Sequence, residues 1–301
     1  IFKIAITAVM LILGSYLLFN QKINIGQFVA AEIVIITIIN SLEKLIISLE
    51  HIYDVITGLY KLDSVLNDSL EKDGKIDFKA NELKIEINNL SFSYNENQKV
   101  FTNLSLLIHP NSITCISGEE NSGKSTLLKL LTGAYKSFDG YITLNDIPLQ
   151  NYTLQSLRKQ TGVLLYEQEL FEGTVFENIS LGKKEITTES IMELSKKLGF
   201  ENIIHRFPSN LTENIDPLGK SLPTSVTSKI LLLQSLIHNP LLIIMEEPWI
   251  GLDENVKKRL QAYLLEESKN KTIVVSTNDN DFANLCKHHI HLNKGNAIIK
   301  K

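Results

Sequence analysis

A glycine-containing loop between an apolar segment and a helical segment constrains the fold most strongly. Residues 112–117 read Ser-Ile-Thr-Cys-Ile-Ser, residues 118–126 read Gly-Glu-Glu-Asn-Ser-Gly-Lys-Ser-Thr, and residues 127–131 read Leu-Leu-Lys-Leu-Leu. This order predicts a buried strand, a phosphate-binding loop and a helix whose N-terminus faces the phosphates. The glycines leave backbone N–H groups free to point at phosphate oxygens. The nucleotide-binding positions predicted in this loop are Gly118, Asn121, Ser122, Gly123, Lys124, Ser125 and Thr126.

Two side chains of this loop have predicted chemical roles. Lys124 is expected to hold the β and γ phosphates of ATP, and Ser125 is expected to offer its hydroxyl to Mg²⁺. ATP and Mg²⁺ are therefore the predicted cofactors.

The chain after about residue 83 alternates strand-like and helical segments. Residues 84–88 alternate polar and apolar side chains, and residues 112–117, 241–245 and 272–276 are short apolar runs. Such runs are typical of buried strands in a mostly parallel sheet. Residues 171–239 are mainly helical and amphipathic in character. We therefore predict an α/β P-loop NTPase cassette with a mixed sheet core plus a helical subdomain.

Two apolar runs precede this cassette. Residues 4–19 carry no charge, and residues 28–47 carry only Glu32, Glu43 and Lys44. Each run approaches the roughly 20 residues that an α-helix needs to cross a bilayer, so we predict two transmembrane α-helices. A secretory signal is a weaker interpretation of the first run, because the second follows so closely. Glu32 is equally compatible with a polar pathway and with a position at the membrane interface.

Helical spacing of apolar residues continues beyond the second run, and a charged stretch then interrupts it. We therefore expect the two transmembrane helices and a cytoplasmic extension in residues 1–66, a linker in residues 67–82 and the nucleotide-binding domain in residues 83–301. The sequence has no initiator Met, and we expect these helices to be the last two of a longer protein.

Composition excludes some classes of partner and site. The net charge is -4, with 30 basic and 34 acidic residues, which predicts no general attraction to nucleic acid. The two cysteines, Cys115 and Cys286, are far apart and lie in no metal-binding spacing. We expect both to be small apolar filling residues in a reducing compartment.

The loop and its surroundings resemble the ATP-binding cassette (ABC) transporters of the exporter type, in which membrane helices precede the cassette. The resemblance covers essentially the whole chain. It implies that Tyr94, in Ser91-Phe-Ser-Tyr94, stacks on adenine, although packing at a strand end is an alternative. In Leu241-Leu-Ile-Ile-Met-Glu-Glu-Pro248 it implies that Glu246 contacts Mg²⁺ and that Glu247 is the general base. With Lys124, Glu247 is a predicted catalytic residue, and Asp253 is predicted to face a partner cassette.

Three elements depart from the family pattern. Tyr166 stands where the family has glutamine, and Gln168, two residues later, either replaces it or is a solvated side chain. Asn278 stands in the position of the family's histidine, and an amide does not take up a proton near neutral pH. The Leu-Ser-Gly-Gly-Gln signature is replaced by a segment that we expect to grip a γ-phosphate poorly. This segment consists of Leu222, Pro223, Thr224, Ser225 and Val226.

The resemblance implies an integral membrane protein of the cell or inner membrane with a cytoplasmic cassette. In the family two cassettes bind ATP between them, so the expected partners are the lipid bilayer and a second half-transporter. A hetero-dimer is favoured over a homo-dimer, because a homo-dimer would carry every departure twice. The predicted function is ATP-driven outward transport of a solute, with an impaired hydrolytic site in this chain. Alternatives are a regulatory ATP-binding partner and a truncated, inactive transporter.

Overall fold

The computed structural model describes residues 2–66, 71, 73–95, 98–204, 207 and 210–300. The chain forms two compact units, residues 1–71 and residues 72–301, which are described separately. Of the predicted linker, residues 67–70 and 72 lie outside the described residues.

The first unit consists of two helices, α1 (Phe2–Phe19) and α2 (Ile25–Leu66). Asn24 and Gln27 exchange hydrogen bonds of 2.8 and 3.0 Å at the start of α2, which stabilises the helix N-terminus. A Cβ atom at Gly14 would lie 2.1 Å from the ring of Phe28, so the glycine permits close packing of the two helices.

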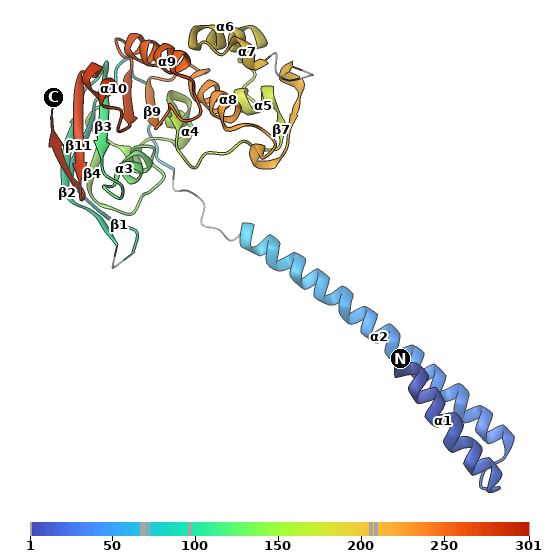
Figure 1. The fold of residues 1–301 in the computed structure, drawn as a ribbon. Coiled ribbons are helices and arrows are strands. Elements are labelled where there is room, and N and C mark those ends of the chain that lie inside the picture. The colour runs from blue at the N-terminus through green and yellow to red at the C-terminus, as the bar shows by residue number, and fades with distance from the viewer. Residues whose placement is uncertain are drawn as a thin grey trace. The chain divides into compact units, whose positions relative to one another are not determined.

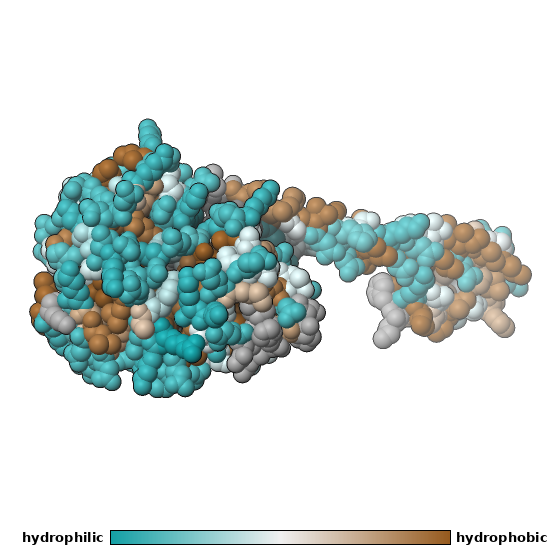
Figure 2. Space-filling model, turned by 90° about the horizontal axis from the view of Figure 1, so that it is seen from above, coloured by the Kyte–Doolittle hydropathy of each residue, from teal (hydrophilic) through white to brown (hydrophobic). Residues whose placement is uncertain are grey.

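Many large apolar side chains of this unit are exposed, and Figure 2 shows them among hydrophilic residues on its surface. Among the described residues, one helix, over Ile25–Ser64, is long and apolar enough to cross a membrane, and Lys3–Phe19 is a shorter apolar helix. Only 6% of the most apolar window of the longer helix is buried. Such exposure is costly in water and is expected of side chains that face lipid.

The second unit is built around a six-stranded sheet with the order β12-β11-β3-β10-β9-β6. Five of these strands are parallel, and β12 pairs antiparallel with β11. The strands are β3 (Ser112–Gly118), β6 (Thr161–Leu164), β9 (Leu242–Glu246), β10 (Thr272–Ser276), β11 (His288–Asn293) and β12 (Asn296–Ile299). The central strands β3, β9 and β10 are buried almost throughout, as their apolar sequences predicted.

A second, antiparallel sheet has the order β2-β1-β4-β5. Its strands are β1 (Ile85–Ser93), β2 (Lys99–Ile108), β4 (Asp139–Leu144) and β5 (Ile147–Pro148). Ile85 pairs with Ile108 on one side and with Leu144 on the other. Fully buried residues of this sheet share one core cluster with Leu127 and Leu128 of helix α3 (Lys124–Leu131). The helix that follows the phosphate-binding loop is therefore anchored in an apolar core.

The cassette also contains the helices α4 (Leu154–Gln160), α5 (Val175–Ser180), α6 (Thr188–Leu198), α7 (Glu201–Ile204), α8 (Thr224–Leu236), α9 (Glu254–Glu267) and α10 (Asn280–Leu285). Of these, α5, α6, α7 and α8 lie at the end of the cassette away from the antiparallel sheet, whereas α10 lies beside β3 (Figure 1). Short elements connect them, namely η1 (Leu149–Asn151), η2 (Asn210–Thr212), η3 (Pro217–Gly219), β7 (Gly173–Thr174) and β8 (Asn214–Ile215). Capping boxes at Thr174 and Thr187 start α5 and α6.

The predicted fold class is confirmed, with a mixed sheet core and a helical part. The two cysteines are fully buried, as expected of small apolar side chains. Because β3, β9 and β10 run parallel as neighbours, the loops after Gly118, Glu246 and Ser276 emerge at the same edge of the sheet.

Candidate functional site

The phosphate-binding loop joins β3 to α3. Gly123 has a φ of 99°, a left-handed conformation, and a Cβ atom there would lie 2.8 Å from the ring of Phe101. The Lys124 ammonium donates hydrogen bonds to the carbonyl oxygens of Gly118 (2.7 Å) and Glu119 (2.9 Å). These contacts hold the positive charge inside the curve of the loop, where phosphate oxygens are expected to bind.

Glu246 lies directly against the start of α3. One of its carboxylate oxygens accepts a hydrogen bond from the hydroxyl of Ser125, and the other accepts one of 3.2 Å from the backbone N–H of Tyr166. A hydroxyl and a carboxylate in contact are the oxygen ligands that Mg²⁺ accepts when phosphates and water complete its octahedron. The residues present therefore fit Mg²⁺. Glu246 is one methylene longer than the aspartate usual at this position in the resembled family, and its carboxylate reaches Ser125. No cluster of three or more His, Cys, Asp or Glu that could hold a metal occurs among the described residues.

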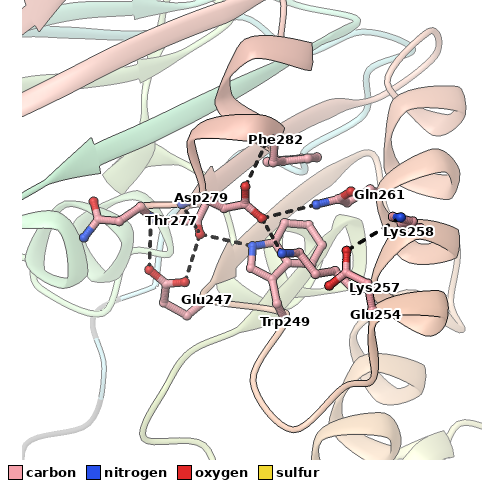
Figure 3. Close-up of polar contacts among 10 residues, drawn as sticks. Glu247, Trp249, Glu254, Lys257, Lys258, Gln261, Thr277, Asp279 and Phe282 are labelled. Atoms are coloured by element: carbon pink, nitrogen blue, oxygen red, sulfur yellow. Dashed lines mark hydrogen bonds and ion pairs between the residues drawn. The ribbon is translucent and has the colours of Figure 1, made fainter.

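Glu247 has an unusual backbone conformation for a residue with a side chain. Its φ is 41°, in the left-handed region, and its backbone N–H donates 2.8 Å to the carbonyl oxygen of Ser276. Its carboxylate accepts hydrogen bonds from the hydroxyl of Thr277 (2.9 Å) and from the backbone N–H of Asn278 (3.2 Å). Figure 3 shows the carboxylate facing Thr277. Neither the strained backbone nor the bond to Thr277 has a signal in the sequence.

Asn278 connects β10 to the phosphate-binding loop. Its side-chain oxygen accepts a 3.1 Å hydrogen bond from the backbone N–H of Gly118. The residue was predicted to contact nucleotide, and the structure places its amide beside the first glycine of the loop. Its nitrogen remains available as a hydrogen-bond donor on the same side chain.

Tyr94 lies at the end of β1 and is 44% exposed. Its hydroxyl and that of Thr126 form a 2.9 Å hydrogen bond, and its ring meets those of Phe92 and Tyr135 edge to face at 5.1 and 5.6 Å. Thr126 is in the first turn of α3. The bond therefore holds an exposed aromatic ring next to the phosphate-binding loop, where a base can stack on it.

Replacing Tyr94 by alanine is expected to weaken ATP binding about 5-fold to 150-fold, because base stacking on an aromatic ring contributes roughly 1 to 3 kcal/mol. Calorimetric titration with a non-hydrolysable ATP analogue measures the change. Tyr94→Phe is the matched control, since it keeps the ring and loses only the hydroxyl with its bonds to Thr126 and Tyr135. Equal affinity in wild type and Tyr94→Ala would show that the ring only packs at a strand end.

Gln168 and Tyr166 occupy different environments. Tyr166 is 70% exposed. Gln168 is half-buried, accepts from the backbone N–H of Leu165 at 3.3 Å and donates to Gln234 on α8 at 3.1 Å. The interpretation of Gln168 as a solvated side chain is wrong, because these partners turn its amide toward α8. A role in nucleotide binding stays a prediction for this residue.

The signature-like segment, residues 222–226, forms the start of α8. Pro223 is the N-cap residue and offers no side-chain hydrogen bond. Val226 is 4% exposed and belongs to the core of the helical region, so its side chain points inward. A Cβ atom at Gly251, where φ is 77°, would lie 3.2 Å from the Cα atom of Ser225. The start of α8 therefore packs closely on the loop that precedes α9.

Asp253 ends that loop. Its carboxylate accepts a 3.0 Å hydrogen bond from the N–H of Val256, and this bond lowers the pKa of Asp253 below its usual range. The side chain is exposed, and contact with a partner cassette stays a prediction.

Asp279 is the N-cap residue of α10 and contacts α9. It accepts from the N–H of Phe282 at 3.1 Å and forms an ion pair of 2.7 Å with Lys257. Burial raises the pKa of Asp279, but the Lys257 ammonium and the N–H of Phe282 outweigh burial, so the net pKa lies below the ordinary 3.8.

A lowered folded-state pKa means that Asp279 stabilises the fold above its ordinary pKa, and that this stabilisation is lost as pH falls through the folded-state value. Asp279→Asn is expected to lower the free energy of unfolding by about 1 to 3 kcal/mol at pH 7, because asparagine can still cap α10 but lacks the charge that pairs with Lys257. The difference from wild type should shrink below pH 3.8. Urea unfolding at several pH values measures it. Asp146→Asn is the control, because its ion pair with Lys84 is at the surface. A pH-independent difference would contradict the assignment.

Together, the fold and the site define a P-loop nucleotide-binding cassette. The sequence model of the ABC transporter family matches residues 101–249. An uncharacterised ABC transporter ATP-binding protein of Bacillus subtilis, YwjA, is 27% identical over 276 residues, which are 90% of this chain and 48% of the relative. A probable ABC transporter ATP-binding/permease protein of Haemophilus influenzae is 30% identical over 212 residues, 70% of this chain and 38% of the relative. The chain belongs to the ABC transporter family.

A solved structure shares the fold. The structure of a bacterial Atm1-family ABC exporter with ATP bound superposes on this chain with a TM-score of 0.74 and 18% sequence identity. The match covers 96% of this chain and 52% of the exporter chain. The chain spans about half or less of the length of the relatives and of this exporter.

Proposed function

We propose that the chain is an ATP-binding subunit of an ABC exporter, which couples ATP binding and hydrolysis in a cassette dimer to outward transport of a solute. Residues 83–301 form the nucleotide-binding domain, residues 67–82 the linker and residues 1–66 two transmembrane helices of a cell or inner membrane. The observation that carries this proposal is the edge of the sheet where Lys124, the Ser125–Glu246 pair and Glu247 converge.

The chemistry proposed for this edge follows from its charges. Lys124 neutralises phosphate charge, and the backbone N–H groups of the loop bind phosphate oxygens. Mg²⁺, when bound by Ser125 and Glu246, lowers the negative charge of the phosphates. Glu247 orients a water molecule and accepts its proton. The Asn278 amide can donate a hydrogen bond to the phosphates but does not take up a proton.

We further propose that hydrolysis at this chain's own site is impaired and that the partner is a more complete half-transporter. At this chain's own site, Tyr166 and Asn278 stand where the family has glutamine and a proton-accepting histidine. The signature-like segment acts on the partner's site instead. Val226 replaces a polar signature residue and is buried, and Pro223 contributes no N–H at the start of α8, which supports weak binding of a γ-phosphate held by the partner. A homo-dimer would have this weakness at both sites.

ATPase measurements on the purified full chain test the proposal. The chain alone is expected to bind ATP and to turn it over at least about 10-fold more slowly than a complete exporter in the same assay, because removing transition-state donors typically costs that much or more. Co-expression with a half-transporter that has an intact signature is expected to restore turnover. Turnover by the chain alone at the rate of a complete exporter would overturn the impaired-site proposal, and failure to bind ATP would overturn the function.

A regulatory ATP-binding partner is the second candidate, favoured by the turn of Gln168 toward α8. Glu247→Gln in the paired complex distinguishes the two. Loss of turnover at one of the two sites is expected if this chain hydrolyses ATP, whereas unchanged turnover indicates the regulatory role.

A further inference from the structure

A buried hydroxyl next to Glu247 has all its hydrogen-bonding positions filled. Thr277 is fully buried, and its Oγ1 accepts from the indole N–H of Trp249 at 3.1 Å and from the backbone N–H of Asp279 at 3.2 Å. A hydroxyl has two acceptor positions and one proton. Because both acceptor positions are occupied by N–H donors, the proton is directed to the third partner, the Glu247 carboxylate at 2.9 Å. Figure 3 shows this convergence.

The segments that supply the two N–H donors are themselves held in place. The ring of Trp249 packs edge to face on that of Phe282, with centroids 4.8 Å apart, and Phe282 is fully buried. Asp279 forms the ion pair with Lys257 on α9. The hydroxyl of Thr277 therefore has little freedom to rotate away from the carboxylate.

Glu247 needs such support, because its left-handed backbone is disfavoured for a residue with a side chain. The side chain of Asn278 does not support Glu247, because its amide faces Gly118. Asn278 reaches the carboxylate through its backbone N–H. Thr277 is the described residue whose side chain donates a hydrogen bond to the carboxylate.

We propose that Thr277 is the positioning residue for Glu247 and that Trp249 in turn orients the hydroxyl of Thr277. The proposal rests on the proposed function, in which Glu247 accepts a proton from water. A buried hydroxyl and an indole N–H thus support the base in this chain, which has asparagine at position 278 where the family has histidine.

Thr277→Val and Thr277→Ser test the proposal in the complex that hydrolyses ATP. Valine matches the shape of threonine and lacks the hydroxyl. We expect kcat at this chain's site to fall about 10-fold to 100-fold with ATP affinity within about 2-fold of wild type, because a misplaced base slows only the chemical step. Serine restores the hydroxyl, and kcat is expected to return to within about 3-fold of wild type. Thr277→Val with wild-type kcat, or Thr277→Ser as slow as Thr277→Val, would overturn the proposal.

Trp249 provides a readout that does not need turnover, since it is the only tryptophan of the chain. In Thr277→Val the indole loses its acceptor, so the emission maximum is expected to shift to shorter wavelength, whereas Thr277→Ser keeps the wild-type maximum. An unchanged maximum in Thr277→Val would contradict the bond.

Trp249→Phe keeps a ring against Phe282 and removes the N–H, and is expected to lower kcat about 3-fold to 10-fold at unchanged ATP affinity. This variant decides the matter if Thr277→Val does not fold, and wild-type kcat in it overturns the role of Trp249. Glu247→Gln separates the two proposals. If that variant keeps wild-type turnover, the proposed function fails, whereas slow Glu247→Gln with fast Thr277→Val rejects only the positioning role.

Discussion

Replacing Glu247 by glutamine is expected to lower ATP turnover at this chain's site about 100-fold to 10,000-fold, with ATP affinity nearly unchanged. An amide has almost the shape of a carboxylate but does not accept a proton from water. It also has one oxygen fewer to receive the two donors that reach the carboxylate, the hydroxyl of Thr277 and the N–H of Asn278. Steady-state turnover and calorimetric ATP binding, measured on the same complex, separate the two effects.

Glu254→Gln is the matched control for this substitution. Glu254 lies in the first turn of α9, is exposed, and forms an ion pair of 4.0 Å with Lys258. The control is expected to leave turnover within about 2-fold of wild type, because exposed ion pairs contribute little. If Glu247→Gln and Glu254→Gln gave equal turnover, Glu247 would not be the base.

Lys124→Ala is expected to weaken ATP binding about 100-fold. A charge-assisted hydrogen bond contributes about 1.5 to 3 kcal/mol, and the upper part of this range corresponds to about 100-fold in affinity. The carbonyl oxygens of Gly118 and Glu119 already hold the Lys124 ammonium, so ATP binding costs little additional side-chain entropy. Displacement of a fluorescent ATP analogue measures the affinity.

Lys258→Ala is the control for Lys124→Ala, because it removes the same charge from an exposed position on α9. Its ATP affinity is expected to stay within about 2-fold of wild type. A loss below 5-fold in Lys124→Ala would contradict the placement of phosphate in this loop. Unfolding measurements on both variants show whether a loss of affinity reflects a loss of structure.

Much of the fold was predictable because the signals are local. The apolar runs at 112–117, 241–245 and 272–276 coincide with β3, β9 and β10. The antiparallel sheet was only partly anticipated, through residues 84–88. Strand β2 pairs with β1 as the next strand along the chain, whereas β4 pairs with β1 only after β3 and α3 have intervened. Pairing of the second kind depends on contacts that no short segment specifies.

The site shows the same division. The loop at Gly118–Thr126 was predictable because its glycines, lysine and hydroxyls are contiguous and each has a local conformational or chemical reason. The orientation of Gln168 was not predictable from the sequence, because its partner Gln234 lies 66 residues away on α8. Thr277 was not singled out either, since a threonine after an apolar strand has no pattern that marks it.

The sequence alone determined that this chain forms a strand, a phosphate-binding loop and a helix, preceded by apolar helices, because backbone conformation and hydropathy are properties of short segments. Tertiary structure decided which groups meet at the edge of the sheet. The strand order places β10 between β3 and β9, so that Asn278 reaches Gly118 and Thr277 reaches Glu247. Hydrogen bonds between residues 160 and 30 positions apart exist only once the parallel strands have packed side by side.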